Sequence, residues 1–189
     1  MLNQPKSIMI CGPNGVGKST ITEMIRQKYK GVRTLIDPDK IAKDQSVSPI
    51  EAGRIASAMI KSNIAKKYSF IRESTLSSNS DFLMLRDAKA NDFEAHLIYV
   101  GVIDVEINVD RVRQRVLKGG HDVPEEDIRR RYTRSLENLT RAIQLVDRAE
   151  IIDNSSRSYQ SIAKFEKGKL ISHISPPQWF QEILEPFII

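Results

Sequence analysis

Residues 12–19 read GPNGVGKS, and they constrain the fold of this 189-residue chain more than any other stretch. They match the phosphate-binding pattern G-x-x-x-x-G-K-[ST], with an apolar run before them at 7–11 and a helical pattern from Lys18 onward. Such a loop bends around a phosphate, so that backbone N–H groups point inward and the positive end of the following helix lies behind them. We therefore expect a P-loop fold that binds a nucleoside triphosphate and Mg²⁺.

The side chains of this loop have separate expected roles. Lys18 supplies a charge to the β- and γ-phosphates, Ser19 supplies a hydroxyl to Mg²⁺, and Thr20 contacts the α-phosphate. Gly15 and Gly17 permit the backbone angles and the close approach that the loop needs. The residues of the loop expected to contact the nucleotide are Gly12, Pro13, Asn14, Gly15, Val16, Gly17, Lys18, Ser19 and Thr20.

Strand-length and helix-length patterns alternate along the chain. Strands are expected at 7–11, 33–36, 69–72, 95–100 and 150–152, and helices at 18–30, 49–67, 81–91, 104–117 and from Asp122 onward, where Asp122 and Glu125 form a capping box around Pro124. A hairpin at 164–173 and a helix at 178–184 follow. This order predicts one α/β domain over 1–189, a P-loop kinase-like parallel sheet with helices on both faces, a helical lid and a small C-terminal hairpin and helix.

Ligands of such sheets bind beyond the carboxyl ends of the strands, so the residues after each strand are candidates. Asp39, in Asp37-Pro38-Asp39, is expected to hold an acceptor hydroxyl and take its proton, or to reach Mg²⁺ through water. Glu73, Ser74 and Thr75 suit a hydroxyl-rich substrate, and Asn154 is expected to contact the nucleotide. The alternatives are a turn in which Asp39 caps a helix and a turn-forming loop at 73–78.

The net charge of +5 is concentrated between residues 111 and 148, where ten basic and six acidic side chains leave an excess of +4. This excess favours an anionic partner, either a polyphosphate or a nucleic acid. Arg111, Arg115 and Lys118 share one helix face, and Arg130 and Arg134 form a second pair. We expect two or three of these side chains to act on phosphate and the others to be solvated or ion-paired, within a lid over about 111–135 hinged at 119–121.

Several classes of protein are excluded by composition. No run of eighteen apolar residues exists, so no membrane partner is expected. Cys11 is the only cysteine, which excludes an internal disulfide framework and a cysteine-based zinc site. The first residues lack the pattern of a signal peptide, and a cytoplasmic location is expected.

The second half of the chain resembles a known family. The string from Arg111-Val-x-x-Arg115 through Gly119-Gly-His-Asp-Val-Pro124 to Ser135-Leu-x-Asn-Leu139 resembles the zeta-toxin-like kinases, and more closely the bacterial branch often labelled predicted ABC-type ATPase. The P-loop and the segments at 37–39, 73–76 and 153–155 match in order, so the resemblance covers roughly 8–155. No LSGGQ-type signature is present, and a transporter partner is not expected.

This resemblance implies transfer of phosphate from ATP, with Mg²⁺, to a hydroxyl of a small molecule such as the sugar nucleotide UDP-N-acetylglucosamine. It implies that Asp39 is the general base, that Glu73 and Thr75 lie in the substrate-contacting segment, and that Arg111 is one of two arginines around the transferred phosphate. The second role falls to His121, Arg129 or Arg130. We expect Arg130 to be catalytic and His121 to contact the substrate. An antitoxin protein is a further expected partner.

Three other functions fit the same residues. A P-loop ATPase stimulated by nucleic acid would use the basic helices, but Tyr132 is the only aromatic residue there, so this function is disfavoured. A metabolic kinase for a nucleoside or a simple sugar would keep the chemistry with another acceptor. A nucleotide-binding regulator would bind ATP without consuming it.

Overall fold

The computed structural model describes residues 4–29, 31–32, 34–156 and 158–188. In this part of the chain, one sheet has the strand order β2-β3-β1-β4-β5-β6-β7. Its strands are β1 (Lys6–Cys11), β2 (Thr34–Ile36), β3 (Phe70–Ser74), β4 (Glu94–Gly101), β5 (Arg148–Asp153), β6 (Gln160–Glu166) and β7 (Lys169–His173). The first five strands pair in parallel, and the hairpin of β6 and β7 extends the sheet antiparallel from β5. The parallel α/β sheet expected from the sequence is confirmed.

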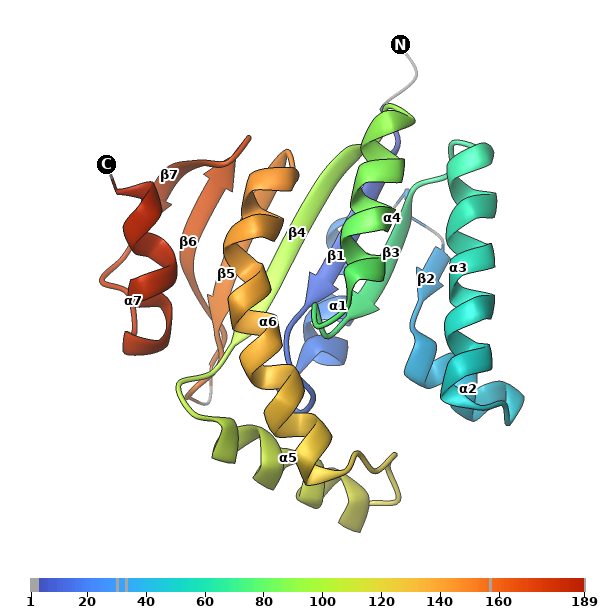
Figure 1. The fold of residues 1–189 in the computed structure, drawn as a ribbon, viewed down its shortest axis with the longest axis horizontal. Coiled ribbons are helices and arrows are strands. Elements are labelled where there is room, and N and C mark those ends of the chain that lie inside the picture. Colours follow the sequence, from blue (N-terminus) through green and yellow to red (C-terminus); the bar gives the residue numbers. More distant parts are fainter. Residues whose placement is uncertain (1–3, 30, 33, 157, 189) are drawn as a thin grey trace.

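Helices cover this sheet on both faces (Figure 1). They are α1 (Lys18–Lys28), α2 (Pro38–Gln45), α3 (Pro49–Ala65), α4 (Asn79–Ala90), α5 (Val105–Leu117), α6 (Glu125–Leu145) and α7 (Gln178–Leu184), followed by a 3-10 turn at Glu185–Phe187. The helices α3, α4, α6 and α7 lie on one face, and α1 lies on the other. α5 crosses the edge at which the parallel strands end, so it lies above the loops that carry the candidate site.

The core divides into two layers because successive strand residues point to opposite faces. On β1, Met9 and Cys11 join the cluster under α3, α4 and α6, whereas Ile8 and Ile10 pack with Ile21 of α1. These four side chains of β1 are fully buried. Burial raises the pKa of the Cys11 thiol well above its usual value, so this cysteine is a packing residue.

The structure adds one helix that the sequence patterns did not predict. α2 begins at Pro38, and its N-cap is Asp37, whose carboxylate accepts hydrogen bonds from the N–H groups of Asp39 and Lys40 at 3.0 and 3.3 Å. Asp39 therefore lies in the first turn and is not the cap. The short helix has no buried residue, so it lacks the apolar stripe by which helices are recognised.

Two predicted boundaries are also wrong. The capping box is absent, because α6 begins at Glu125 with Pro124 at the N-cap, and the Asp122 carboxylate accepts from the N–H of Val123. The C-terminal hairpin begins at Gln160 rather than 164. Lys30 and Arg33, where a predicted helix ends and a predicted strand begins, lie outside the described residues. In the described part of the chain, no helix has both the length and the apolar character needed to cross a membrane.

Candidate functional site

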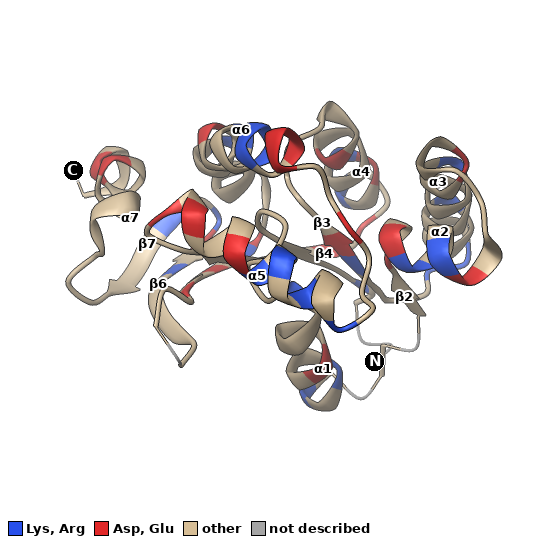
Figure 2. Ribbon diagram, turned by 90° about the horizontal axis from the view of Figure 1, so that it is seen from below, with Lys and Arg blue, Asp and Glu red and all other residues tan. Residues whose placement is uncertain are grey.

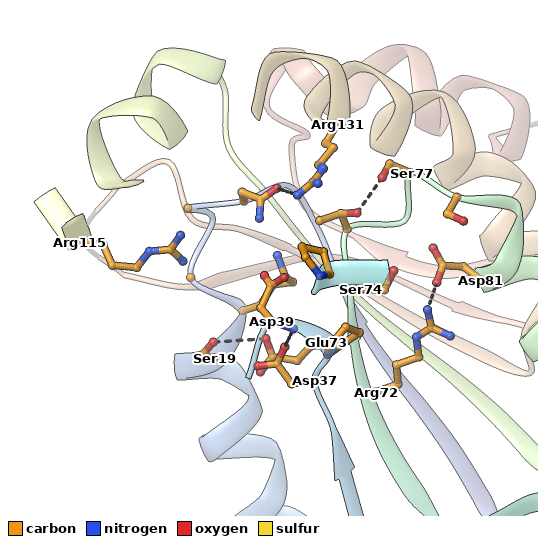
Figure 3. Close-up of a pocket in the computed structure, with 18 of the residues that line it drawn as sticks. Ser19, Asp37, Asp39, Arg72, Glu73, Ser74, Ser77, Asp81, Arg115 and Arg131 are labelled. Carbon is orange, nitrogen blue, oxygen red and sulfur yellow. Dashed lines mark hydrogen bonds and ion pairs between the residues drawn. The ribbon is translucent and has the colours of Figure 1, made fainter. Parts of the chain in front are cut away.

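The loops at the carboxyl ends of β1, β2 and β3 enclose a cavity of about 500 Å³ together with α5 and α6 (Figure 3). Its lining comes from segments far apart in the sequence and is mostly polar. The lining residues are Asn14, Gly15, Gly17, Lys18, Ser19, Thr20, Asp37, Pro38, Asp39, Pro49, Arg72, Glu73, Ser74, Thr75, Ser77, Ser78, Asp81, Arg111, Arg115 and Arg131. The cavity is thus at the carboxyl edge of the parallel strands, where the order of strands and helices predicts a ligand.

Lys18 lies at the base of the glycine-rich loop. Its ammonium donates to the carbonyl oxygens of Gly12 and Pro13 at 2.8 and 3.0 Å. Burial lowers the pKa of Lys18, while the carboxylates of Glu73 and Asp39 oppose this change. A cation held in this way at a helix N-terminus suits the phosphates of a nucleotide.

The loop is supported from outside the cavity. The Asn154 amide donates to the carbonyl of Val16 at 2.8 Å, and the Tyr159 hydroxyl donates to the carbonyl of Gly17 at 3.2 Å. Gly17 has a φ of +95°, and a Cβ there would lie 2.6 Å from the Tyr159 hydroxyl. Of the predicted nucleotide contacts, Gly12, Pro13, Val16 and Asn154 do not line the cavity, and Asn154 instead supports the loop through Val16.

Glu73 lies below Ser19 at the foot of α1. The side chain is 6% exposed and accepts hydrogen bonds from Ser19 Oγ at 3.2 Å and from Thr22 Oγ1 at 2.7 Å. Burial raises the pKa of Glu73 above its ordinary value. Mg²⁺ in nucleotide sites is held by one or two carboxylates together with phosphate oxygens and water. The oxygens of Ser19, Glu73 and nearby Asp37 fit such an ion.

Asp37 and Asp39 differ in what their carboxylates do. Asp37 caps α2 with two backbone hydrogen bonds, and burial raises its pKa. Asp39 projects from the first turn of α2 and lines the cavity (Figure 3). Asp39 is therefore better placed than Asp37 to meet an incoming hydroxyl.

Three arginines line the cavity from the helices above it. Arg111 and Arg115 come from α5, and Arg131 comes from α6. Arg111 Nη2 donates to the carbonyl of Asn154 at 2.9 Å, and Arg131 Nη1 donates to Asn14 Oδ1 at 3.1 Å. Arg111 Nη1 and the Nε and Nη2 atoms of Arg115 are buried and have no hydrogen-bond partner among the described residues. Buried charged donors without acceptors are costly, so these atoms mark a place for an anion.

Three other arginines of α5 and α6 form ion pairs outside the cavity. Arg129 pairs with Glu106 at 2.6 Å and Arg113 with Glu125 at 2.8 Å. Arg130 pairs with Asp127 at 2.6 Å and does not line the cavity. Figure 2 shows acidic and basic segments interleaved along both helices. In the described part of the chain, five of the ten basic residues between 111 and 148 thus form ion pairs.

Arg130 and His121, to which the sequence assigned roles at the site, do not line the cavity. His121 is exposed in the connection between α5 and α6 and, like Arg130, is not a lining residue. Arg115 and Arg131 are there instead. A sequence signal for Arg131 existed, because it shares the inward stripe of α6 with Ile128, Ser135 and Leu139, three to four residues apart.

The part of the cavity beyond Asp39 is lined by hydroxyl groups and one buried ion pair. Ser74 ends β3, and the loop from β3 to α4 carries Thr75, Ser77 and Ser78. The hydroxyls of Thr75 and Ser77 are 2.7 Å apart. Arg72 and Asp81 pair at 2.9 Å beneath them. Arg72 and Glu73 face opposite sides of β3, so Glu73 faces Ser19 and Thr22 of α1, and Arg72 faces the side of the hydroxyl groups. No sequence motif indicated Arg72 or Asp81.

Comparison with known sequences places this site in context. The family model described as Zeta toxin matches residues 2–162. A protein of Haemophilus influenzae, described as uncharacterized, is 39% identical over 134 residues, which are 68% of this chain and 94% of that protein.

Solved structures share the fold at low sequence identity. A chain from the PezAT chromosomal toxin–antitoxin system of Streptococcus pneumoniae has a TM-score of 0.63 and 17% identity, over 97% of this chain and 84% of its own. The AvrRxo1-ORF1:-ORF2 complex with ATP has a TM-score of 0.70 and 14% identity, over 97% of this chain and 63% of the other. At these identities the likeness concerns the fold alone.

Proposed function

Because the chain belongs to the zeta toxin family and is a nucleotide-dependent kinase, we propose that it transfers the γ-phosphate of ATP to a hydroxyl of a sugar nucleotide resembling UDP-N-acetylglucosamine. In this proposal the triphosphate lies between the glycine-rich loop and the arginines of α5 and α6. The acceptor lies in the hydroxyl-lined part of the cavity, beyond Asp39.

The observation that carries this proposal is the set of buried guanidinium nitrogens of Arg111 and Arg115 that have no acceptor among the described residues. They line the same cavity as Lys18, whose ammonium is held by two loop carbonyls. A triphosphate between them would supply acceptors to both sets of donors. Positive groups fixed around the transferred phosphate stabilise the charge that spreads over its oxygens in the transition state.

The remaining groups divide the chemistry among themselves. Asp39 would accept the proton of the acceptor hydroxyl as its oxygen attacks the γ-phosphorus and the bond to the β-phosphate oxygen breaks. Ser19, Glu73 and Asp37 would hold Mg²⁺, which when bound neutralises phosphate charge. Arg131 would steady both Asn14 of the loop and the transferred group.

The acceptor is the least constrained part of the proposal. Serine and threonine hydroxyls, with the neutralised Arg72–Asp81 pair, suit a substrate rich in hydroxyl groups. A sugar nucleotide fits this chemistry, and the same chemistry admits the nucleoside or simple sugar of a metabolic kinase. A panel of these acceptors can be incubated with ATP and Mg²⁺ and analysed by mass spectrometry for one added phosphate. The result distinguishes a sugar-nucleotide kinase from a metabolic kinase.

The role of Asp39 is tested by Asp39→Asn, which keeps the shape of the side chain and removes its basicity. Transfer to UDP-N-acetylglucosamine should fall by about 10²–10⁴-fold, the range for loss of a general base. ATP affinity, measured by calorimetry, should stay within about twofold. The matched control is Asp44→Asn, an exposed change on the same helix. Normal transfer by Asp39→Asn would remove Asp39 from the role of base.

We also propose that a partner protein silences this kinase, because the structural neighbour PezAT is a toxin–antitoxin system. Such a partner should co-purify with the chain expressed from its own genomic context and should inhibit transfer. Full transfer activity of the purified complex would contradict the proposal.

A further inference from the structure

Leu76 has an unusual backbone conformation in the loop that lines the acceptor part of the cavity. Its φ is +55°, in the left-handed region that residues with a side chain seldom occupy. The side chain is fully buried, so it fixes this turn to the core. The residues on both sides, Thr75 and Ser77, line the cavity. The turn at Leu76 therefore determines where the acceptor-facing hydroxyls lie.

Two side chains hold the peptide groups of Leu76 in this conformation. The N–H of Leu76 donates to Ser74 Oγ at 3.0 Å, and its carbonyl accepts from Asn138 Nδ2 at 2.9 Å. Asn138 lies on α6, 62 residues away in the sequence, and it does not line the cavity. A strained backbone conformation persists only where several surrounding contacts hold it in place. Asn138 supplies the hydrogen bond that comes from outside the loop.

The same face of α6 also reaches the phosphate-binding loop. Arg131, Ser135 and Asn138 follow at helical spacing, so their side chains lie along one stripe. Arg131 donates to Asn14 Oδ1 at 3.1 Å, and the Ser135 hydroxyl lies 3.0 Å from that of Tyr99 on β4. One helix face thus contacts the loop expected to hold ATP and the loop expected to hold its acceptor.

We propose that Asn138 is a positioning residue that orients the 74–78 loop for the acceptor, relative to the nucleotide, without touching either substrate. This inference rests on the proposed function for the identity of the acceptor. It predicts that removal of the Asn138 amide donor weakens binding of the acceptor substrate and leaves ATP binding intact.

Asn138→Asp is the sharpest test, because it is nearly isosteric and exchanges the N–H donor for an oxygen that faces the Leu76 carbonyl. The KM for UDP-N-acetylglucosamine should rise about tenfold, as expected for one lost and unsatisfied hydrogen bond. The KM for ATP should stay within about twofold. Asn138→Gln keeps the amide donor and should return the acceptor KM to within about threefold of the wild-type value. Glu137→Gln, an exposed neighbour on α6, is the control and should behave as wild type.

Amide hydrogen exchange of the 74–78 segment provides a reading that needs no substrate. In Asn138→Asp this segment should exchange about tenfold faster, with exchange of the glycine-rich loop unchanged. If the wild type does not phosphorylate UDP-N-acetylglucosamine, the proposed acceptor fails, and the exchange measurement still decides the role of Asn138. Unchanged exchange at 74–78, equal rises in both KM values, or no rescue by Asn138→Gln would each overturn the inference.

Discussion

At the scale of single residues, Glu73 combines burial with two hydroxyl partners. Burial is the largest cause of its raised pKa, and the hydrogen bonds from Thr22 and Ser19 only partly offset it. A carboxyl with a higher pKa in the folded state favours folding at low pH, and this contribution is lost as pH rises through the folded-state pKa. At neutral pH the charged Glu73 therefore costs stability, which is consistent with a functional rather than a structural role.

The first prediction follows from this cost. Glu73→Gln should raise Tm at pH 7 by about 2–4 °C, the change expected for about 1 kcal/mol in a chain of this size, and it should lower the rate of phosphate transfer. The gain in Tm should shrink at pH 4, because the raised pKa of Glu73 lets the folded state take up this proton more readily than the unfolded chain does. Thermal unfolding at both pH values measures this, with the exposed Glu182→Gln as control. An equal gain at both pH values would show that charge burial is not the cause.

The neighbouring Arg130 and Arg131 allow a matched second prediction. Both guanidinium groups pair with Asp127, Arg130 at 2.6 Å and Arg131 at 3.5 Å, but of the two only Arg131 lines the cavity and contacts Asn14. Arg131→Ala should lower kcat by about 10²–10³-fold, the effect of removing one positioned donor to developing charge. Arg130→Ala should stay within about twofold. Steady-state kinetics of the two variants decides the matter, and the reverse order would restore the role first expected for Arg130.

These arginines show what could be predicted at the residue scale. Lys18, Ser19 and Asp39 were placed in the cavity because a motif or the end of a strand fixed their position. Charge does not distinguish Arg130 from Arg131, because ten basic residues of similar chemistry occupy 111–148, and the acidic partners of Arg113 and Arg129 follow from the packing of α5 against α6. Charge alone could not identify which side chains reach the cavity.

At the scale of elements, α5 rests directly on the glycine-rich loop. A Cβ on Gly15 would lie 2.5 Å from the carbonyl oxygen of Asn108 and 3.1 Å from the Val112 side chain, and Gly15 has a φ of +79°. The close approach brings Arg111 and Arg115, which are on the same helix, above Lys18. The absence of a side chain at position 15 is therefore a condition for the arginines to reach the cavity.

The third prediction compares two glycines. Gly15→Ala should lower the free energy of unfolding by about 1–3 kcal/mol through overpacking and backbone strain, and it should weaken ATP binding. Gly53→Ala, in the interior of α3 where a Cβ meets nothing within 4 Å, should raise the free energy of unfolding by about 0.5–1 kcal/mol. Urea unfolding curves measure both. Equal effects would show that α5 does not press on the loop.

Element boundaries could be predicted where apolar periodicity was strong. β1, β4 and α5 lie within one or two residues of their expected limits. α2 was missed because none of its residues is buried, and it is stabilised by the Asp37 cap and by Pro38 in its first turn. The segment at 122–125 has the composition of a capping box, but the Asp122 carboxylate accepts a hydrogen bond from the adjacent N–H of Val123. Composition does not determine which of these two contacts forms.

At the scale of the whole molecule, the C-terminal part of the sheet supports the nucleotide loop at the centre. The hydroxyl of Tyr159, just before β6, reaches the carbonyl of Gly17 across 142 residues of sequence. Asn154, after β5, holds Val16 in the same way and also receives Arg111. The loop is thus braced by residues from the far side of the chain, which local sequence patterns could not indicate.

The fourth prediction tests this brace. Tyr159→Phe removes one hydrogen bond, which should lower the free energy of unfolding by about 0.5–1.5 kcal/mol. ATP affinity should fall by about 2–10-fold, because a loosened loop binds with an entropy cost. Calorimetric titration with ATP and Mg²⁺ measures this, and Tyr68→Phe, at a side chain that is 61% exposed, is the control. Unchanged ATP affinity in Tyr159→Phe would show that the loop keeps its shape without the brace.

The single tryptophan of the chain lies on the same brace. Trp179 of α7 donates from Nε1 to Asp153 Oδ1 at 2.7 Å, and its ring lies against Gly101, where a Cβ would come within 2.3 Å of it. Asp153 immediately precedes the asparagine that holds the loop, so the indole sits one residue from the nucleotide support. The molecule therefore carries its own fluorophore at that point, and we expect its emission to change when a nucleotide binds, without any dye or label.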